Sequence, residues 1–360
     1  MSGTRESSAP LPRRRRLLFA SGILASALVS LAVGAEVVLR LCGVAPWRLP
    51  SNTTSVEPGG SLFRPDPVLG YTHLPGAFVV TLATGYKFRM THLPNTLRVT
   101  HQMETYPSSP EKESIWIFGC SHTHGWSLND EETYPWLLQE FFPDFEIVNF
   151  GVSGYGTLHS LLQLQEALQH SRPRLVVLAY ASFHDVRNLL LRKRQKAVLV
   201  MQRFGSVLQP YARLDEQGEL RIEMATQEYR EFPLMRLSAL SHFLEMTWND
   251  IEASRSNSAE VAHKLVLEID RVAKDHGTRL VVAFIHQKCD EMKRFTDEHG
   301  IPSVDISVDL SIPGNTNKPH NPHPSARANR FYADALEPFL RRMLAETAAT
   351  DARVEADVLK

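Results

Sequence analysis

Four segments of the sequence carry residue types that together perform acyl transfer. Ser121 lies in a glycine-flanked segment at 119–125, and a second glycine-rich segment occupies 149–156. His184 follows a third apolar run, and His323 lies near the end of the chain. A serine hydroxyl attacks an ester carbonyl, an imidazole takes its proton, and amides beside glycines bind the oxyanion that forms. The sequence therefore predicts the parts of an acyl-transfer site.

The elements that must position these groups follow from the hydrophobic pattern. Short apolar runs occupy residues 114–119, 145–150, 174–180, 278–285 and 301–307, and helical stretches such as 131–142 and 158–169 lie between them. Strands alternating with helices predict βαβ units, and near-continuous apolar strands predict a parallel sheet covered on both faces. The expected fold is α/β, a three-layer αβα sandwich. Ligands bind beyond the carboxyl ends of such strands, so the four segments should meet at one edge.

These segments resemble the sequence blocks of the SGNH/GDSL hydrolase superfamily. IFGCSHTHGWSLNDEETYPWLL at 117–138 is similar to the first block, NFGVSGYG at 149–156 to the second, and HPSARANRFYADAL at 323–336 to the last. DPVLGYTHLPGA at 66–77 resembles the stretch that precedes the domain in membrane-anchored members. The resemblance covers about residues 111–345. It implies a mostly parallel, flavodoxin-like five-stranded sheet and a serine esterase.

The resemblance also implies a role for each group of the site. Ser121 would be the nucleophile, and its own amide would join the amide of Gly154 in binding the oxyanion. His323 would take the proton from Ser121 and return it to the leaving alkoxide. Taken singly, Ser121 also fits a turn-capping serine, Gly154 an ordinary turn glycine and His323 a surface histidine. The flanking Gly119 and Gly125 favour catalysis for Ser121, and the following Pro324 and closing helix favour it for His323.

Three positions depart from the family pattern. Cys120 replaces the aspartate before the nucleophile, and a small buried cysteine is expected there. His184 replaces the asparagine of the third block. Its ring N–H either donates to the oxyanion as an amide does, or it caps and packs its own segment. No acid precedes His323 at the usual spacing, so we expect a Ser–His dyad or a triad with an unusual third member. Three residues are candidates to orient the imidazole: His320, Asn321 and Asp305.

The N-terminus carries a membrane signal. Arg13 to Arg16 are four consecutive arginines, and residues 17–35 contain no charge. At about 1.5 Å per residue this run nearly spans a hydrocarbon core of roughly 30 Å. The basic flank predicts a cytoplasmic N-terminus and a single-pass inner-membrane anchor at 17–41, with an extracytoplasmic, periplasmic domain. A signal peptide cleaved near Ala35 is the alternative.

The rest of the chain divides by composition. Residues 1–16 form a basic tail, 42–110 a linker with a small β-rich segment, and 348–360 a C-terminal tail. The hydrolase domain is expected at 111–347. Its insertion at 195–258 should contain a hairpin turning at Gln217-Gly218 and an amphipathic helix at 233–251. The last helix is expected at 325–344, with Pro324 at its start.

Composition excludes several classes of protein. The net charge of −1 argues against nucleic-acid binding, and three widely spaced cysteines exclude a disulfide-stapled mini-domain and a CxxC zinc pair. An envelope location favours a small-molecule, glycan (O-acyl carbohydrate) or lipid ester as substrate. Transfer of the acyl group to a sugar hydroxyl stays open, since the same acyl-enzyme serves both reactions. No cofactor is implied.

Two further readings remain. A zinc hydrolase would use imidazole and thiolate ligands on the same edge of the sheet. Its candidate ligands are Cys120, His122, His124, His184, His320 and His323. A binding protein of the envelope that kept the cleft but lost catalysis is the other reading.

Overall fold

The computed structural model describes residues 12–49, 54–102, 112–202, 208–226 and 228–358. The chain forms two compact units, one of Met1–Pro50 with Arg230–Glu252 and the other of Ser51–Tyr229 with Ala253–Lys360. The larger unit contains the parallel sheet and all of the candidate site residues. The smaller unit contains the apolar N-terminal helix and most of one helix from the insertion.

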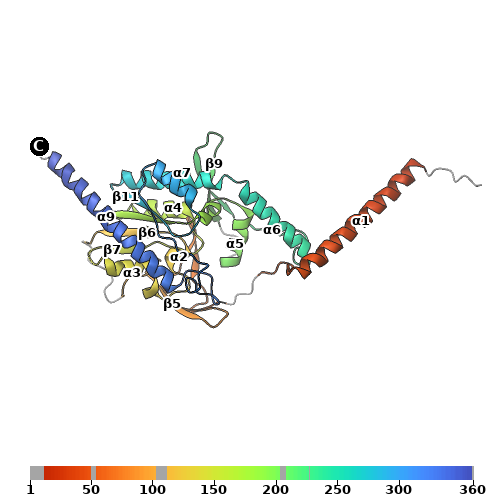
Figure 1. The fold of residues 1–360 in the computed structure, drawn as a ribbon, viewed down its shortest axis with the longest axis horizontal. Coiled ribbons are helices and arrows are strands. Elements are labelled where there is room, and N and C mark those ends of the chain that lie inside the picture. Colours follow the sequence, from red (N-terminus) through yellow and green to blue (C-terminus); the bar gives the residue numbers. More distant parts are fainter. Residues whose placement is uncertain (1–11, 50–53, 103–111, 203–207, 227, 359–360) are drawn as a thin grey trace, which may run out of the picture. The chain divides into compact units, whose positions relative to one another are not determined.

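Five parallel strands form the centre of the larger unit (Figure 1). They are β6 (Ser114–Phe118), β7 (Glu146–Asn149), β8 (Leu175–Tyr180), β11 (Arg279–Phe284) and β12 (Ser303–Asp305). Each strand lies within a predicted apolar run, and the order across the sheet is β12-β11-β8-β6-β7. This order is flavodoxin-like and confirms the expected α/β fold. The chain reverses direction across the sheet between β6 and β8, which is where ligands bind in such folds.

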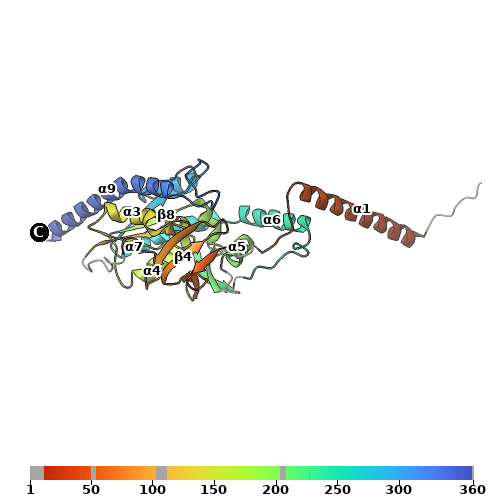
Figure 2. The ribbon, with the colours of Figure 1, turned by 90° about the horizontal axis from the view of Figure 1, so that it is seen from below.

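Helices cover both faces of the sheet, as Figure 2 shows. α4 (Thr157–Ala167) and α7 (Ser258–Asp275) pack on one face, and α3 (Tyr134–Phe141) and α9 (Ala326–Val358) on the other. Trp116 and Phe118 of β6 point into the first layer, while Ile115 and Ile117 point into the second. Since side chains alternate along a strand, an unbroken apolar run is needed to fill both layers.

The antiparallel strands upstream of the sheet belong to the same compact unit. They are β1 (Ser55–Glu57), β4 (Gly76–Thr81) and β5 (Lys87–His92), with β2 (Phe63–Asp66) paired to β3 (Gly70–His73). Arg98 forms a bridge to Asn149 of β7, and the Thr100 hydroxyl donates to the carbonyl of Ile147 at 2.7 Å. The boundary expected at 110 therefore does not separate two compact units, because this segment packs directly on the edge of the sheet.

The insertion expected at 195–258 is divided between the two units. α5 (Arg192–Gln202) is followed by the predicted hairpin of β9 (Leu208–Leu214) and β10 (Leu220–Thr226). Gly218 turns that hairpin with a φ of 76°, which favours glycine. α6 (Ala239–Ser254) begins later than the helix expected at 233–251, because Leu234 has a positive φ of 60° and lies in a turn.

Both terminal helices differ in length from the expectation. α1 (Arg13–Leu41) includes the expected anchor and is long and apolar enough to cross a membrane, by length and composition. α9 continues to Val358, through the residues expected to form a C-terminal tail. Residues 345–358 contain no glycine or proline and are rich in alanine and glutamate, so they extend the helix.

Candidate functional site

Ser121 is the first residue of the helix that follows β6. The chain leaves the strand at Phe118, passes through Gly119 and an extended Cys120, and enters α2 (Ser121–His124). A Cβ at Gly119 would meet the Thr123 hydroxyl oxygen at 2.2 Å, so only glycine allows a turn this tight. The turn brings Ser121 to the carboxyl end of the strand, at the reversal of the sheet order.

Ser121, His323 and Asn321 form one hydrogen-bonded chain. The Nε2 atom of His323 lies 2.9 Å from the Ser121 hydroxyl oxygen. Its Nδ1 atom lies 2.6 Å from the Asn321 side-chain oxygen. Ser121 and His323 are 202 positions apart in the sequence. The structure thus brings together the predicted nucleophile, the predicted base and one of the three candidate orienting residues.

The orientation of the Asn321 amide is fixed by two donors. Its Oδ1 atom accepts from the His323 backbone N–H at 3.0 Å as well as from Nδ1. A backbone amide only donates, so the atom that faces it must be oxygen rather than nitrogen. Nδ1 of His323 therefore carries the ring proton, and Nε2 offers its lone pair to the Ser121 hydroxyl. This is the tautomer that a general base requires.

The other two orienting candidates lie elsewhere. The ring of His320 stacks on Tyr86, and its Nδ1 atom contacts the Thr84 hydroxyl at 3.0 Å. The exposed Asp305 accepts from the backbone N–H of Ser307 at 3.0 Å. His320 and Asn321 are both close enough to His323 in the sequence to contact its ring. The conformation of the turn decides between them, because it directs Asn321 toward the ring and His320 toward Tyr86.

Two backbone amides at the site have no acceptor among the described residues. The amide of Ser121 is at the start of α2, where helix amides lack a partner within the helix. The amide of Gly154 lies in the buried loop after β7 and makes no hydrogen bond within the described part of the chain. Gly154 has a φ of 85°, which favours glycine. Both predicted donors are therefore free for a ligand atom.

His184 is buried in the turn after β8. It lies in the short helix η3 (Ser182–Arg187), and its Nδ1 atom accepts from the Ala181 backbone N–H at 3.4 Å. Its Nε2 atom is buried without a partner in the described structure. Because Nδ1 accepts, Nε2 carries the proton and is an unused donor. Nδ1 of His184 therefore caps its own turn, and its Nε2–H is left as a donor without an acceptor among the described residues. These are the two roles that the sequence left open for this residue.

Arg187 sets the electrostatics around the imidazole. Its guanidinium donates to the Tyr155 carbonyl at 3.0 Å and stacks over the Phe183 ring at 4.4 Å, and it forms no ion pair with a carboxylate in the described ranges. Burial, and then this cation, lower the pKa of His323 from 6.5 to about 4. Burial also lowers the pKa of Arg187 itself. His323 is therefore neutral, and able to accept a proton, near neutral pH.

Three aromatic rings from the loops after neighbouring strands lie near the His323 imidazole. The ring of His122 lies 5.7 Å from that of His323 and 5.6 Å from that of Phe183. His286 lies 5.2 Å from Phe183 and 6.4 Å from His122. His286 follows the fourth predicted strand, so the strand-end rule that located the other residues applies to it too. Phe183, Arg187 and His286 were not predicted as site residues.

Arg98 braces the loop that carries the nucleophile. Its side chain is fully buried and donates to the carbonyls of His124, Gly125 and Leu128 at 2.7, 2.6 and 2.8 Å. Its Nε atom pairs with Asp130 at 2.9 Å. One guanidinium thus ties three carbonyl groups and one carboxylate behind α2. No local sequence pattern predicts this residue, because its partners lie about thirty positions away.

Three buried histidines form a stack beside this brace. His92 and His124 meet through their Nε2 atoms at 2.9 Å, and the ring of His73 stacks 4.2 Å from each of them. His92 Nδ1 lies 2.9 Å from the Leu74 carbonyl oxygen, so it donates and its Nε2 accepts. Burial lowers the pKa of His92 to about 3 and lowers those of His73 and His124 as well. The stack is therefore neutral.

The zinc site considered from the sequence does not form. Its candidate ligands are separated, with His124 in the histidine stack, His320 on Tyr86 and His122 beside His323. In the described ranges the one group with ligand spacing is His73, His92 and His124. The His73 ring is stacked 4.2 Å from the other two and inclined to them by only 12° and 27°, so its nitrogen lone pairs lie in a different, nearly parallel plane, and one ion does not lie in all three ring planes. The positive Arg98 beside them further disfavours a cation.

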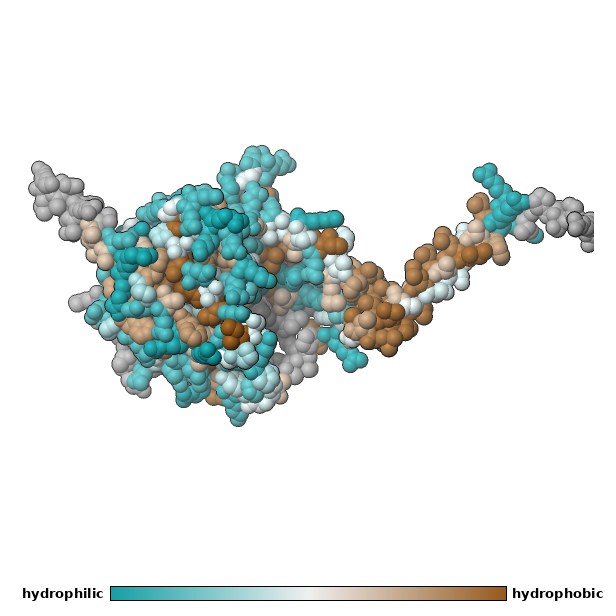
Figure 3. Space-filling model, in the orientation of Figure 1, coloured by the Kyte–Doolittle hydropathy of each residue, from teal (hydrophilic) through white to brown (hydrophobic). Residues whose placement is uncertain are grey.

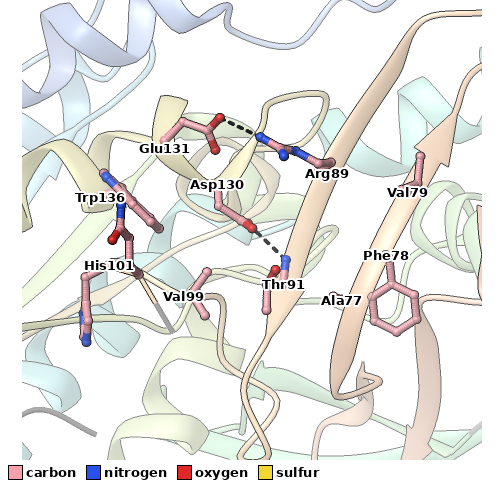
Figure 4. Close-up of a pocket in the computed structure, with 11 residues that line it drawn as sticks. Ala77, Phe78, Val79, Arg89, Thr91, Val99, His101, Asp130, Glu131 and Trp136 are labelled. Carbon is pink, nitrogen blue, oxygen red and sulfur yellow. Dashed lines mark hydrogen bonds and ion pairs between the residues drawn. The ribbon is translucent and has the colours of Figure 1, made fainter. Parts of the chain in front are cut away.

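A pocket of about 430 Å³ lies between the antiparallel strands and the segment after α2 (Figure 4). Arg89 pairs with Glu131 at 3.0 Å on its rim, and Asp130 accepts from the Thr91 backbone N–H at 3.0 Å. Trp136 also lines the pocket, whereas Ser121, Asn321 and His323 do not. We assign this pocket no part in the chemistry.

Comparisons with known proteins give similarity in fold. No protein-family model matches the sequence, and no curated protein is similar at a significant level. A member of the lipolytic G-D-S-L family from Veillonella parvula is 14% identical, with 64% of this chain and 99% of that chain covered and a TM-score of 0.38. The psychrotrophic esterase EstA from a Pseudoalteromonas species, in a structure inhibited by monoethylphosphonate, is 11% identical, covers 65% and 100%, and has a TM-score of 0.38. AlinE4, an SGNH-hydrolase family esterase, is 14% identical, covers 69% and 98%, and has a TM-score of 0.33.

Proposed function

We propose that this protein is a membrane-anchored serine esterase that acts through an acyl-enzyme. The observation that carries the proposal is the hydrogen-bonded chain from Ser121 to His323 to Asn321, at 2.9 and 2.6 Å. Two free backbone amides and one unused imidazole N–H lie in the loops after the neighbouring strands. Nucleophile, base and oxyanion donors are the parts that ester cleavage needs.

The proposed reaction has two matched halves. His323 Nε2 takes the hydroxyl proton of Ser121 as the serine oxygen bonds to the ester carbonyl carbon. The Ser121 and Gly154 amides, with the N–H of His184, donate to the oxyanion. The carbon–oxygen bond to the alcohol then breaks, and His323 returns the proton to the leaving alkoxide. Water repeats the sequence on the acyl-enzyme and releases the acid.

Asn321 makes this an uncharged variant of the serine triad. The amide oxygen holds the imidazole in the correct tautomer, which is the first task of the usual carboxylate. It carries no negative charge, and Arg187 adds a positive one nearby, so the imidazolium formed during the reaction is less stabilised. We therefore expect slow turnover with an intact mechanism.

The membrane anchor limits the class of substrates that the enzyme would meet. We propose that α1 spans the cytoplasmic membrane with the basic residues Arg13 to Arg16 inside, and that the catalytic unit lies outside. Substrates would then be esters of the envelope, either O-acyl groups on glycans or lipid esters. The uncharged run of α1 and its arginine flank support this orientation.

The test uses the full chain in lipid nanodiscs. Wild type, Ser121→Ala and His323→Ala are assayed for p-nitrophenyl acetate hydrolysis, with and without a chelator, beside the control Ser160→Ala at a buried serine in α4. We expect the first two substitutions to abolish turnover, the control to retain it, and the chelator to change nothing. Turnover that survives in Ser121→Ala, or that the chelator removes, would contradict the proposal.

A further inference from the structure

α6 buries polar side chains and exposes apolar ones, which is the opposite of a helix on the surface of a water-soluble domain. Its buried positions include Glu245 and Asn249, which are joined by a side-chain hydrogen bond. Its exposed positions carry large apolar side chains, namely Phe243, Leu244, Trp248 and Ile251. Leu244 is 52% exposed and Trp248 is 53% exposed. A helix whose outer face is apolar is suited to an apolar surrounding rather than to water.

The exposed apolar side chains form one stripe. Positions 244, 248 and 251 are spaced by four and three residues, so they lie on the same face of the helix. The turn before α6 carries two further exposed apolar side chains, Leu234 and Leu237, which are 69% and 72% exposed.

The first turn of α6 is bonded to the end of α1. The Glu36 carboxylate accepts from the backbone N–H groups of Ala239 and Leu240 at 2.9 and 2.8 Å, and from the Ser238 hydroxyl at 2.7 Å. A carboxylate at this position satisfies the free amides of a helix start and complements its dipole. Glu36 therefore caps a helix that begins two hundred residues later in the sequence.

Three further bonds hold the same two segments together. Arg40 donates to the carbonyl of Leu237 at 2.9 Å. His242 Nδ1 contacts the Ala45 carbonyl oxygen at 2.7 Å. The backbone N–H of Trp47 donates to the carbonyl of Met235 at 2.8 Å. The start of α6 is thus fixed to the residues that follow the apolar run of α1.

The position of Glu36 along α1 sets the depth of this junction. Residues 17–35 carry no charge, and Glu36 is the first charged residue after Arg16. At about 1.5 Å per residue that run occupies nearly the whole hydrocarbon core, so Glu36 and Arg40 reach the headgroup layer. α6 therefore starts at the membrane surface if α1 spans the membrane.

We propose that α6 and the turn before it lie in the interfacial layer of the membrane that holds α1. The apolar stripe would contact acyl chains, with Trp248 at the level where indole rings concentrate. Arg40 and Arg236 are exposed but paired with Glu36 and Glu231, so the apolar stripe rather than these cations carries the contact with lipid. Figure 3 shows hydrophobic side chains along α1 and at the neighbouring end of α6. This inference rests on the membrane anchor in the proposed function and is independent of the esterase chemistry.

The test measures the depth of spin labels on the full chain in nanodiscs that contain anionic lipid. Cys42→Ser removes the exposed cysteine, since Cys120 and Cys289 are buried. Single nitroxides are then placed through Leu244→Cys, through Ala27→Cys in α1, and through Gln217→Cys in the hairpin turn. Collision with oxygen and with a water-soluble nickel chelate is compared at the three sites.

We expect the labels at 244 and 27 to collide more with oxygen and less with nickel than the label at 217, by several-fold. A lipid-like label at 27 with a water-like label at 244 overturns the interfacial helix and leaves the anchor standing. A label at 244 shielded from both reagents means that protein, such as a second copy, covers the stripe, and this also overturns the proposal. A water-like label at 27 overturns both the anchor and the interfacial helix, while hydrolysis of p-nitrophenyl acetate by the same sample tests the esterase separately.

Discussion

At the scale of single residues, the chemistry depends on how His323 is held. Its ring is fixed between the Ser121 hydroxyl and the Asn321 amide oxygen, and Arg187 is the cation that lowers its pKa within the part of the chain that the structure describes. Asn321, in the place of the usual carboxylate, holds the imidazole in the required tautomer but supplies no negative charge to stabilise its protonated form. Both the pH dependence and the rate should reflect this missing charge.

The pH dependence follows from the lowered pKa of His323. The base works only when neutral, and the pKa of His323 is about 4, so kcat/KM should show no fall near pH 6.5 and should stay flat toward lower pH for as long as the protein stays folded. Arg187→Gln removes a cation that lowers this pKa, so the fall in kcat/KM should begin at a higher pH than in the wild type. The check is a pH–rate profile of both proteins with p-nitrophenyl acetate. A midpoint near 6.5 in the wild type would show that the imidazole is not buried as described.

Asn321→Asp should increase the rate. A carboxylate would accept the same Nδ1–H and also stabilise the imidazolium, and the reverse change in a serine protease costs about 10⁴ in kcat. Much of that cost came from a wrong tautomer, which Asn321 avoids, so we expect a gain of about tenfold or more. The same substitution should raise the midpoint of the pH profile. An unchanged or lower kcat in a folded Asn321→Asp protein would contradict the assigned role.

At the scale of elements, the strands could be predicted from the sequence, but the braces between them could not. Local apolar runs located β6, β7, β8, β11 and β12, and the strand-end rule then placed Ser121 and His184 on one edge. Arg98 and the stack of His73, His92 and His124 connect segments that are far apart, and no local pattern encodes such contacts. His286 follows a predicted strand and was within reach of the same rule.

Arg98→Ala should destabilise the larger unit strongly. Removing one partner of a buried ion pair leaves the Asp130 carboxylate without its counter-charge and takes one donor from each of three carbonyl groups, which costs about 3–5 kcal/mol. Arg89→Ala is the matched control, because Arg89 and Glu131 are 68% and 48% exposed and such pairs contribute about 0–1 kcal/mol. Urea unfolding of both variants gives the comparison. Equal losses of unfolding free energy would contradict the bracing role of Arg98.

At the scale of the whole molecule, the larger unit buries an unusual set of neutral imidazoles. Among the described residues, eight histidines have a lowered pKa with burial as the first cause: His73, His92, His122, His124, His159, His184, His263 and His323. In the unfolded chain these groups take up protons below about pH 6.5, whereas in the folded protein they stay neutral. The folded state is therefore favoured above that pH and progressively loses stability below it.

This sets a steep acid dependence of stability. Each such histidine adds up to about 1.4 kcal/mol of lost unfolding free energy per pH unit below 6.5, down to its folded pKa, which is about 3 for His92 and about 4 for His323. Urea unfolding between pH 7 and 5 should show this slope. His92→Gln should reduce the slope, and Gln169→Ala, at an exposed position without a titratable group, should leave it unchanged. A stability that is flat across this range would show that the imidazoles are protonated in the folded state.

The most direct test of the central claim is covalent labelling of Ser121. The full chain is treated with a fluorophosphonate, and the adduct is located by peptide mass spectrometry in wild type, His323→Ala and Asn321→Ala. We expect one adduct, on Ser121, formed much more slowly without the His323 imidazole and at an intermediate rate without the Asn321 amide. An adduct on another serine, or labelling of Ser121 at the same rate in His323→Ala, would contradict this claim.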